Sequence, residues 1–388
     1  MQFKNLPLLA LASLATAQEG GNQTQGLNQT LASQPNLSNL TQFLNLNPAL
    51  IGALAQANNI TILAPSDQAF ARIANSSAFR ALGTNPEALA ALLTYHVLNG
   101  TYRASDITNT SAFVPTLLQN SSFSNVTGGQ RVEAVRLGNQ TVFYSGLLQN
   151  STVTQANLNF TGGVIHVVDN LLTLPVSVSD TALAAGLTSL RGGLNQTNLT
   201  STVNNLRDVT IFAPSNQAFQ NVGSGLNIAP QDISNILQYH VINGTVGYSS
   251  GLRNGTSLRT VGGKNLTITI RNGTVFVNAA RVITPNVLVA NGVVHVIDQL
   301  LDPNNSTGPA ANATTGAPAV PGSSVSNAPF TSGQPTPSTT INPTGGAGAA
   351  SSTIARTTGS TAGAMPMKTG AVGAAALFGA AGALFAGF

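Results

Sequence analysis

The segment ITILAPSDQAF, residues 60–70, recurs as VTIFAPSNQAF at residues 209–219. In both copies an apolar, β-branched run ends at a proline, and a serine follows in the position that favours a helix N-cap. The segment therefore predicts a buried strand that leads into a helix, once in each half of the chain. We expect Ser66 and Ser215 to cap these two helices.

Two more blocks repeat in the same order, LLTYHVLNGT (92–101) with ILQYHVINGT (236–245) and GGVIHVVDNLL (162–172) with NGVVHVIDQLL (291–301). Residue 60 matches 209, 92 matches 236 and 162 matches 291, so the spacing falls from 149 to 144 to 129 residues. The first copy must therefore carry extra loop residues, around 71–84 and 110–130. Ordered internal repetition of this kind predicts two homologous domains.

Each copy mixes helix and strand signals. Asn85 and Pro86 precede EALAALLTYH as a cap and first turn, and apolar residues between Leu37 and Leu54 recur at helical spacing. LTITIRNGTVFVN, residues 266–278, alternates around an Asn-Gly turn and predicts a hairpin, with its counterpart at residues 131–145. VIHVVDNLL and VVHVIDQLL are apolar on both faces, which indicates buried strands. Each domain is therefore expected to be a sheet packed with helices.

At these three blocks the sequence resembles the fasciclin-domain family, over about residues 35–303. The resemblance implies an α+β fold: two tandem fasciclin-like domains, each a twisted β-sheet wedge packed with several helices. It also implies extracellular adhesion or matrix roles and no catalytic mechanism. The family's adhesion motif maps onto Tyr95, His96, Val97, Tyr239, His240 and Val241.

The residues themselves allow a second interpretation of this motif. His96 follows Leu92 by four positions and Leu93 by three, so a continuing helix would place its ring on the apolar face. That spacing favours a buried histidine bonded to backbone. Direct contact with a partner through the tyrosines and their apolar neighbours is the other interpretation.

The ends of the chain have the patterns of targeting segments. Residues 1–17 combine Lys4, an apolar run and a small-residue cleavage pattern, which is typical of a signal peptide. Residues 361–388 end in an apolar run behind small residues, which predicts a removed GPI-attachment signal with Ser360 as attachment residue. A genuine membrane span is the alternative for this run.

The remaining boundaries follow from composition. We expect a glycosylated N-terminal segment at 18–34, domains at 35–174 and 175–303, and a disordered Ser/Thr/Pro/Gly-rich stalk at 304–360. Such a stalk cannot bury a core and is typical of O-glycosylated tethers.

Charged residues make up only 7% of the chain, against about a quarter in ordinary soluble domains. Without Lys4 and Lys368 the chain carries 13 basic and 11 acidic residues, so no basic patch for nucleic acid is indicated. Carbohydrate is the expected solubilising group. Asn59 is a doubtful acceptor because it adjoins a core strand; the predicted N-glycosylation sites are Asn22, Asn28, Asn36, Asn39, Asn75, Asn99, Asn109, Asn120, Asn125, Asn139, Asn150, Asn159, Asn195, Asn198, Asn243, Asn254, Asn265, Asn272, Asn305 and Asn312.

The sequence gives little support for an enzyme active site or a metal site. Ser249 lies in GYSSG, but no helix-forming sequence follows it, so the nucleophile-elbow context is missing. His295 and Asp298 are three residues apart on a predicted strand and face opposite ways. The chain has no cysteine, and its four histidines fit no standard metal spacing. We expect no enzyme activity, no cofactor, no metal and no disulfide.

These features predict a GPI-anchored glycoprotein at the outer face of the plasma membrane or in the cell wall. Its expected role is adhesion or matrix and wall contact, with cell-surface, wall or matrix glycoconjugates or proteins as partners and a lipid anchor in the membrane. A passive structural or sorting glycoprotein is the first alternative. A small-molecule or lipid carrier is the second, and it requires an apolar cavity.

Overall fold

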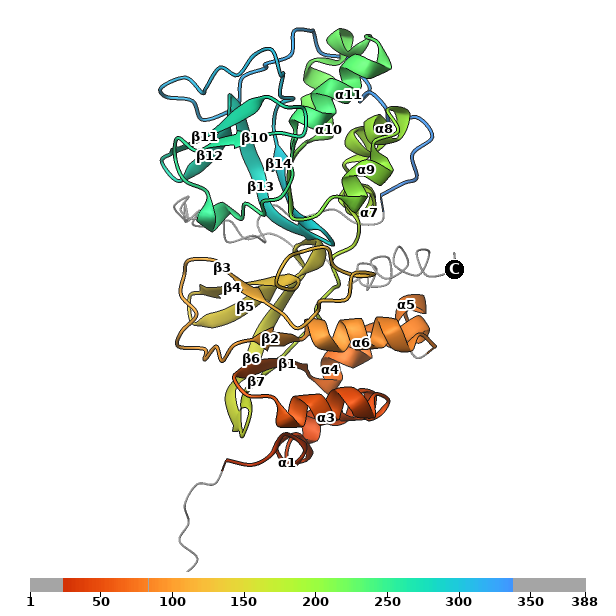
Figure 1. The fold of residues 1–388 in the computed structure, drawn as a ribbon, viewed down its shortest axis with the longest axis vertical. Coiled ribbons are helices and arrows are strands. Elements are labelled where there is room, and N and C mark those ends of the chain that lie inside the picture. The colour runs from red at the N-terminus through yellow and green to blue at the C-terminus, as the bar shows by residue number, and fades with distance from the viewer. Residues whose placement is uncertain (1–23, 83, 338–388) are drawn as a thin grey trace, which may run out of the picture.

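The computed structural model describes residues 24–82 and 84–337. The predicted signal peptide, acceptor Asn22, attachment residue Ser360 and anchor segment lie outside these ranges. Two domains of matching architecture lie end to end along the molecule (Figure 1). Each contains one seven-stranded sheet with helices gathered beside it.

The first domain contains α1 (Leu27–Ala32), η1 (Pro35–Leu37), α2 (Ser38–Asn45), α3 (Pro48–Gln56), β1 (Ile60–Pro65), α4 (Asp67–Ile73), α5 (Ser77–Leu82), α6 (Pro86–Tyr95), β2 (Val97–Asn99), β3 (Ala112–Pro115), β4 (Arg131–Leu137), β5 (Gln140–Tyr144), η2 (Gly146–Leu148), β6 (Asn150–Phe160) and β7 (Gly163–Val168). The second contains α7 (Val178–Ala184), α8 (Thr188–Gln196), α9 (Thr200–Asn205), β8 (Val209–Pro214), α10 (Asn216–Asn221), η3 (Gly223–Leu226), α11 (Pro230–Tyr239), β9 (Val241–Ile242), η4 (Ser249–Gly251), β10 (Ser257–Arg259), β11 (Asn265–Arg271), β12 (Thr274–Val277), β13 (Ala280–Val289) and β14 (Gly292–Ile297).

The two sheets have the same strand order. The first runs β2-β1-β7-β6-β5-β4-β3, and the second runs β9-β8-β14-β13-β12-β11-β10. In each, the first and last long strands pair in parallel, β1 with β7 and β8 with β14, whereas the other neighbours are antiparallel. In the first domain a bridge between Leu98 and Thr116 also brings the two edge strands together. The sheet is therefore curved and nearly closed, as the expected wedge requires.

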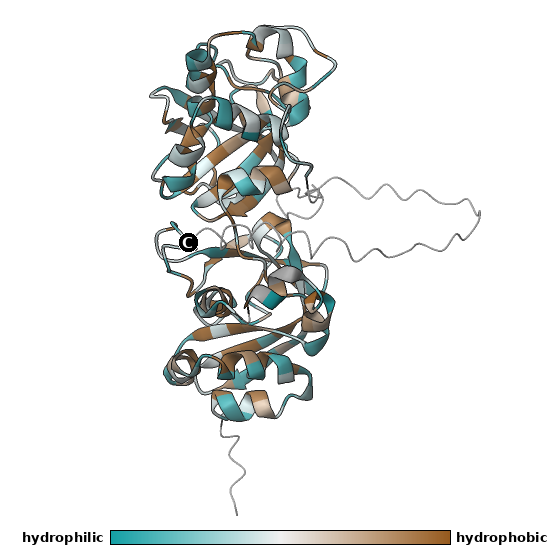
Figure 2. Cartoon of the chain, turned by 90° about the vertical axis from the view of Figure 1, so that its right-hand side faces the viewer, coloured by the Kyte–Doolittle hydropathy of each residue, from teal (hydrophilic) through white to brown (hydrophobic). Residues whose placement is uncertain are grey.

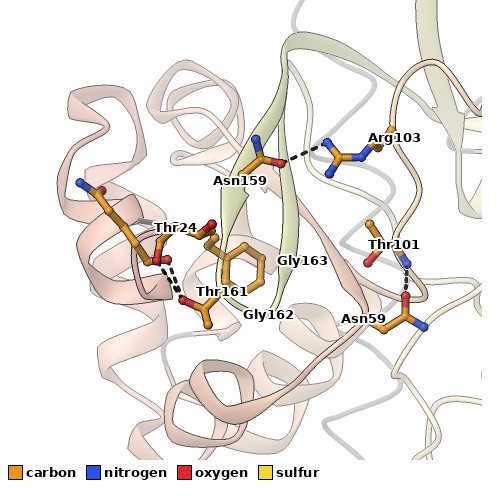
Figure 3. Close-up of a pocket in the computed structure, with 10 residues that line it drawn as sticks. Thr24, Asn59, Thr101, Arg103, Asn159, Thr161, Gly162 and Gly163 are labelled. Carbon is orange, nitrogen blue, oxygen red and sulfur yellow. Dashed lines mark hydrogen bonds between the residues drawn. The ribbon is translucent and has the colours of Figure 1, made fainter. Parts of the chain in front are cut away.

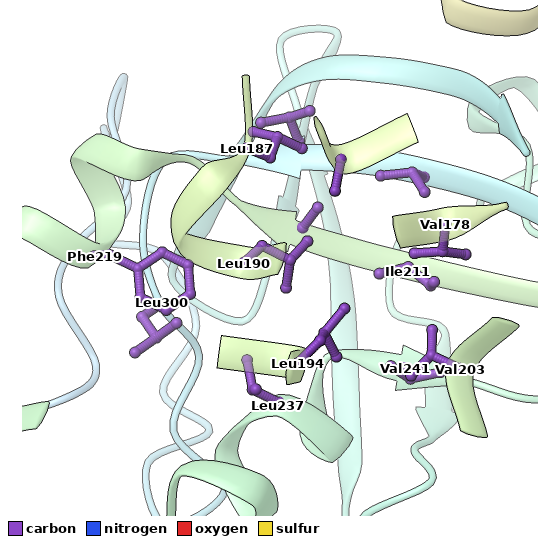
Figure 4. Close-up of a cluster of buried hydrophobic side chains, with 14 of the residues drawn as sticks. Val178, Leu187, Leu190, Leu194, Val203, Ile211, Phe219, Leu237, Val241 and Leu300 are labelled. Carbon is purple, nitrogen blue, oxygen red and sulfur yellow. The ribbon is translucent and has the colours of Figure 1, made fainter. Parts of the chain in front are cut away.

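The central strands are apolar on both faces because both faces are covered. On β1, Ile62 belongs to the hydrophobic cluster shared with the helices, and its neighbour Leu63 belongs to a second cluster inside the curved sheet. The second domain repeats this arrangement with Ile211 and Phe212 on β8. Figure 4 shows the helix-side cluster of the second domain, where Leu190 and Leu194 of α8 meet the sheet. In Figure 2 hydrophobic residues accordingly concentrate on the strands.

Local sequence signals produce the expected elements. The Ser66 hydroxyl accepts a hydrogen bond from the Ala69 N–H at 3.2 Å, and Ser215 accepts one from Ala218 at 3.1 Å. The Asn85 side chain caps α6 in the same way, at 3.0 Å from the Ala88 N–H. These bonds satisfy donors that the first helical turn leaves without partners. The predicted helix starts are confirmed.

The predicted hairpin is also confirmed. β11 and β12 pair antiparallel from Ile268 with Val277 down to Arg271 with Thr274. The two turn residues, Asn272 and Gly273, both have positive φ, at 48° and 75°. A two-residue turn with positive φ at both positions matches the right-handed twist of the flanking strands. Asn and Gly adopt positive φ readily, which explains why they occupy this turn.

The predicted stalk differs from the structure over residues 304–337. Val320 is 6% exposed and belongs to the hydrophobic core of the second domain, and Phe330 packs edge-on against Phe219 with ring centroids 6.0 Å apart. Backbone bonds hold the segment as well, including Val325 N–H to the Gln220 carbonyl at 3.0 Å. The composition of the whole segment predicted an unpacked chain because it averages over all of its residues. Two well-spaced apolar side chains, Val320 and Phe330, suffice to attach the segment to the second domain. Residues 338–360 lie outside the described chain.

Candidate functional site

The two Tyr-His motifs occupy equivalent interior positions. The tyrosines end α6 and α11, and the histidines are the C-caps of these helices. The hydroxyls of Tyr95 and Tyr239 donate to the carbonyls of Arg131 and Asn265 at 3.0 and 2.7 Å. All six side chains of the motif are buried: Tyr95, His96, Val97, Tyr239, His240 and Val241. None of them offers a surface for direct contact with a partner.

Each motif histidine joins two distant pieces of backbone. His96 Nδ1 donates to the Leu92 carbonyl at 2.8 Å, and its Nε2 accepts from the Leu172 N–H at 2.9 Å. His240 does the same with Ile236 at 2.7 Å and Leu301 at 3.0 Å. One ring nitrogen must carry a proton and the other must not, so the neutral ring is required. Burial lowers the pKa of both rings to about 4, although the carbonyl bond opposes this shift.

The other two histidines play a similar role on the last strand of each domain. His166 Nε2 donates to the Tyr102 carbonyl at 2.8 Å, and His295 Nε2 donates to the Gly247 carbonyl at 2.8 Å. Both Nδ1 atoms accept from a backbone N–H of the neighbouring strand. Burial lowers the pKa of His166 and brings that of His295 to about 4. All four histidines are therefore structural links.

The GYSSG segment has no catalytic geometry. Ser249 begins the short helix η4, and its hydroxyl accepts a hydrogen bond from the Asn286 amide at 2.7 Å. Both nitrogens of His295 are bonded to backbone, so this ring is not positioned to take a proton from the serine. The residues that the structure describes also contain no cluster of three or more metal-ligating side chains.

A loop of the first domain fixes the position of the first domain relative to the second domain. In both domains a threonine hydroxyl reaches across a turn, from Thr116 to the Gln130 carbonyl and from Thr260 to the Lys264 carbonyl. Thirteen residues (117–129) lie between the first pair and three (261–263) between the second, so the first domain has an insertion of ten. We call residues 118–127 the junction loop. It lies between α6 and the second domain (Figure 1).

The junction loop binds the second domain mainly through hydrogen bonds. Asn125 N–H donates to the Ala290 carbonyl at 2.8 Å, and its carbonyl accepts from the Asp208 N–H at 3.2 Å. The Asp208 carboxylate accepts from the Thr127 N–H at 2.7 Å and from its hydroxyl at 2.5 Å. Just beyond the loop, the Gln130 amide donates to the Val289 carbonyl at 3.1 Å.

Apolar contacts complete the junction. Leu148 of η2, in the first domain, is 6% exposed and belongs to the hydrophobic core of the second domain. Phe113 and Tyr248 stack across the junction with ring centroids 4.0 Å apart. The repeat spacing showed that extra residues existed in the first copy, but it gave no sign of what they would contact.

The opposite end of the first domain contains a polar recess of about 810 Å³ (Figure 3). The Asn59 side chain accepts from the Thr101 N–H at 2.9 Å, and Arg103 donates to the Asn159 side chain at 3.1 Å. Arg103 is the one charged residue among those that line the recess. The recess therefore offers hydrogen-bonding groups of the kind that suit polar ligands, without a paired nucleophile and base. Sequence inspection missed it because its residues come from separate strand ends.

The recess corresponds to the junction surface of the second domain. Asn59 matches Asp208, and Thr161 and Gly162 match Ala290 and Asn291. The face that the second domain uses to bind the junction loop is thus not covered by a loop of this kind in the first domain, as far as the described residues extend. Two of the residues that line the recess, Asn59 and Asn159, begin sequons, and both side chains are exposed.

The described acceptor asparagines all reach solvent. Of the 21 sequons in the described chain, 18 have exposed asparagines, and those at Asn39, Asn125 and Asn305 are partly exposed. The doubted acceptor Asn59 is among the exposed ones. The fully buried asparagines of the described chain are Asn278, Asn286 and Asn291, and none of these belongs to an Asn-x-Ser/Thr sequence.

Those three buried asparagines serve the fold of the second domain. The Asn278 amide donates to the Tyr239 hydroxyl at 2.9 Å, and the Asn291 amide donates to the Val203 carbonyl at 2.8 Å. Asn286 bonds Ser249 through both its oxygen and its nitrogen. The chain therefore separates its structural asparagines from its acceptor asparagines. Within the described ranges, no helix combines the length and hydrophobicity needed to span a bilayer.

These features define a class of protein, a tandem pair of α+β domains whose surface presents polar recesses and acceptor asparagines. A family model described as the fasciclin domain matches residues 35–175 and again residues 185–303. The chain belongs to the fasciclin-domain family.

Similar proteins occur in fungi. A fasciclin-like arabinogalactan protein of Arthroderma benhamiae is 37% identical over 322 residues, covering 82% of this chain and 76% of the relative. Another from Phaeosphaeria nodorum is 29% identical over 276 residues, covering 71% and 88%. Among solved structures, a FAS1 domain pair from the insect cell adhesion molecule fasciclin I covers 68% of this chain and 96% of that one, with 21% identity and a TM-score of 0.33.

Proposed function

We propose that this protein is a lipid-anchored cell-surface glycoprotein that presents its two fasciclin domains for contact with neighbouring cells or with the wall. The observation that carries this proposal is the placement of asparagines. Every described acceptor is exposed or partly exposed, and every fully buried asparagine of the described chain lies outside a sequon. Glycans on these sites would cover domains whose charged content is only 7%.

Adhesion suits the way the domains are held. The junction loop and Leu148 keep both domains in one arrangement, so a single molecule presents two sites at a fixed spacing. Many such pairs on one surface strengthen weak contacts through their high effective concentration. The names of the relatives, fasciclin-like arabinogalactan proteins, agree with a glycosylated surface protein.

The carrier alternative finds little support in the described residues. Two cavities lined by apolar side chains, one beside Leu92 and one beside Leu190, measure about 10 Å³ each. That volume is at the limit for a single water molecule and far below that of a lipid or drug-sized ligand.

Cell attachment tests adhesion against the passive alternative. Cells that display the full chain should attach to one another or to wall preparations more than cells that display residues 304–388 behind the same signal peptide. A surface variant, Arg103→Glu, keeps every acceptor asparagine, reverses the charge in the recess and removes the hydrogen bond to Asn159. Attachment that is equal in all three cases would show that neither the two domains nor the N-glycans on them contribute to attachment.

The anchor is tested separately. Deletion of residues 361–388 should release the protein into the medium. Retention of the truncated chain on the membrane would contradict the lipid anchor and leave the adhesion test unaffected.

A further inference from the structure

The second domain has a groove beside α11. It measures about 630 Å³ and is bordered by α11, by the turn at residues 261–263, by residues 302–304 and by Val320 and Pro321. We call it the α11 groove and define it by Ile228, Asp232, Val261, Lys264 and Asp302. Ile228 and Val261 are 39% and 37% exposed, and they are two of only five large hydrophobic side chains exposed on the described chain.

The first domain shows what fills this place. There the turn is replaced by the junction loop, which runs back along α6, the counterpart of α11. The Asn120 amide donates to the Glu87 carboxylate in the first turn of α6 at 2.9 Å. Phe123 packs against both hydrophobic clusters of the domain, which include Leu92 and Ala91 of α6. The second domain lacks these ten residues, and in the described part of the chain the groove beside α11 is bordered, but not filled, by Val320 and Pro321.

The residues that line the open groove suit a similar segment. Ile236 and Asn235 of α11 stand where Leu92 and Ala91 stand in the first domain, but Ile236 is buried and Asn235 is polar, so Ile228 and Val261 supply the exposed apolar surface of the groove. Asp232 and Asp302 provide acceptors for amide or hydroxyl donors, as Glu87 does for Asn120. Lys264 donates to the Asn304 side chain at 2.9 Å, so its charge is directed along the rim.

We propose that the α11 groove binds a peptide segment of another extracellular protein, in which an aromatic side chain is flanked by small polar residues. The junction loop, with Phe123 between serines and asparagines, is the internal template for this ligand. The junction loop itself is not the ligand of the α11 groove. Hydrogen bonds to Glu87 of the first domain and Asp208 of the second domain hold it in its own place. The site is separate from the polar recess of the first domain, and the acceptor asparagines Asn265 and Asn305 adjoin its rim.

A peptide with the sequence of residues 118–127 tests the proposal. The full chain, purified with its glycans, is titrated into the fluorescently labelled peptide, and binding is followed by anisotropy. We expect saturable binding with a Kd of about 0.1–1 mM, as is usual for small, transient interfaces. Replacement of the peptide's phenylalanine by alanine should weaken binding at least about tenfold, because aromatic anchors dominate such contacts.

Two protein variants locate the site. Val261→Asp places a charge in the groove and should abolish binding, whereas Ile283→Asp changes an equally exposed residue on β13, outside the groove, and should leave binding intact. Circular dichroism and thermal melting verify that both variants are folded. Three results would overturn the proposal: no binding to the glycosylated chain, equal binding to both variants, or equal binding of the alanine peptide. Concentration-dependent dimers that disappear with Val261→Asp would also overturn it, in favour of self-association.

Discussion

His96 and His240 each hold the end of a helix with one ring nitrogen and a distant backbone N–H with the other. The sequence predicted their burial, because their spacing from preceding leucines and isoleucines placed them on the apolar face. It did not predict the second bond, since residues 172 and 301 are remote in the chain. Loss of either bond would leave a buried polar group without a partner.

Stability should therefore depend on pH in a defined direction. The folded-state pKa of His96, His240 and His295 is about 4, below the unfolded value of about 6.5. The contribution of the neutral rings to the free energy of unfolding is fully present above pH 6.5 and is lost as the pH falls towards 4. We expect the free energy of unfolding to fall by at most about 3 kcal/mol per ring over this window. Urea unfolding at pH 7, 5.5 and 4.5 measures it, and a flat profile would contradict the neutral-ring assignment.

Gly163 is a second residue on which the fold depends. It starts β7 opposite Ile60, and a Cβ atom at this position would lie 1.9 Å from the Ile60 carbonyl oxygen. Gly163→Ala should therefore destabilise the first domain by about 3–5 kcal/mol, because backbone must move in the parallel strand pair. Thermal unfolding measures the loss.

The control is Gly52→Ala in α3, where nothing lies within 4 Å of the added atom. Alanine is the better helix former, so this variant should be neutral or gain up to about 1 kcal/mol. A Gly163→Ala protein as stable as the control would show that the close approach is not a real constraint.

At the level of elements, the sequence best predicted the features that depend on neighbouring residues in the chain. Helix caps at Ser66 and Asn85 and the Asn272 hairpin depend on residues within a few positions, and all three are confirmed. The attachment of residues 304–337 was not predicted, because it depends on pockets built by distant helices. The polar recess was missed for the same reason.

The junction loop makes a testable prediction about domain coupling. Asp208 has a φ of 54° and accepts two hydrogen bonds from Thr127. Asp208→Gly removes the carboxylate, suits the positive φ and leaves the Asn125 sequon intact. We expect the two domains, coupled in the natural chain, to unfold in two separated calorimetric transitions in this variant. One unchanged transition would mean that Leu148 and the ring stack couple the domains without the loop.

For the whole molecule, glycans should determine solubility. The chain has few charged residues, no cysteine and no predicted disulfide, so it lacks the usual ionic surface. Enzymatic removal of N-glycans from the folded protein should leave the fold intact, as followed by circular dichroism, and should cause association, as followed by light scattering. A deglycosylated protein that stays monomeric at high concentration would show that the amide and hydroxyl surface is sufficient.

The junction also explains a difference between the two copies. Asn59 begins a sequon at the open face of the first domain, and its counterpart at the buried junction is Asp208. Asp208→Asn would turn residues 208–210 into an acceptor, because Thr210 is already in place. Sugar added there during synthesis would act as a wedge and hold the domains apart. Small-angle scattering should show a longer particle from a glycosylating host and the native length from bacteria, so an aspartate at this position keeps a glycan out of the junction.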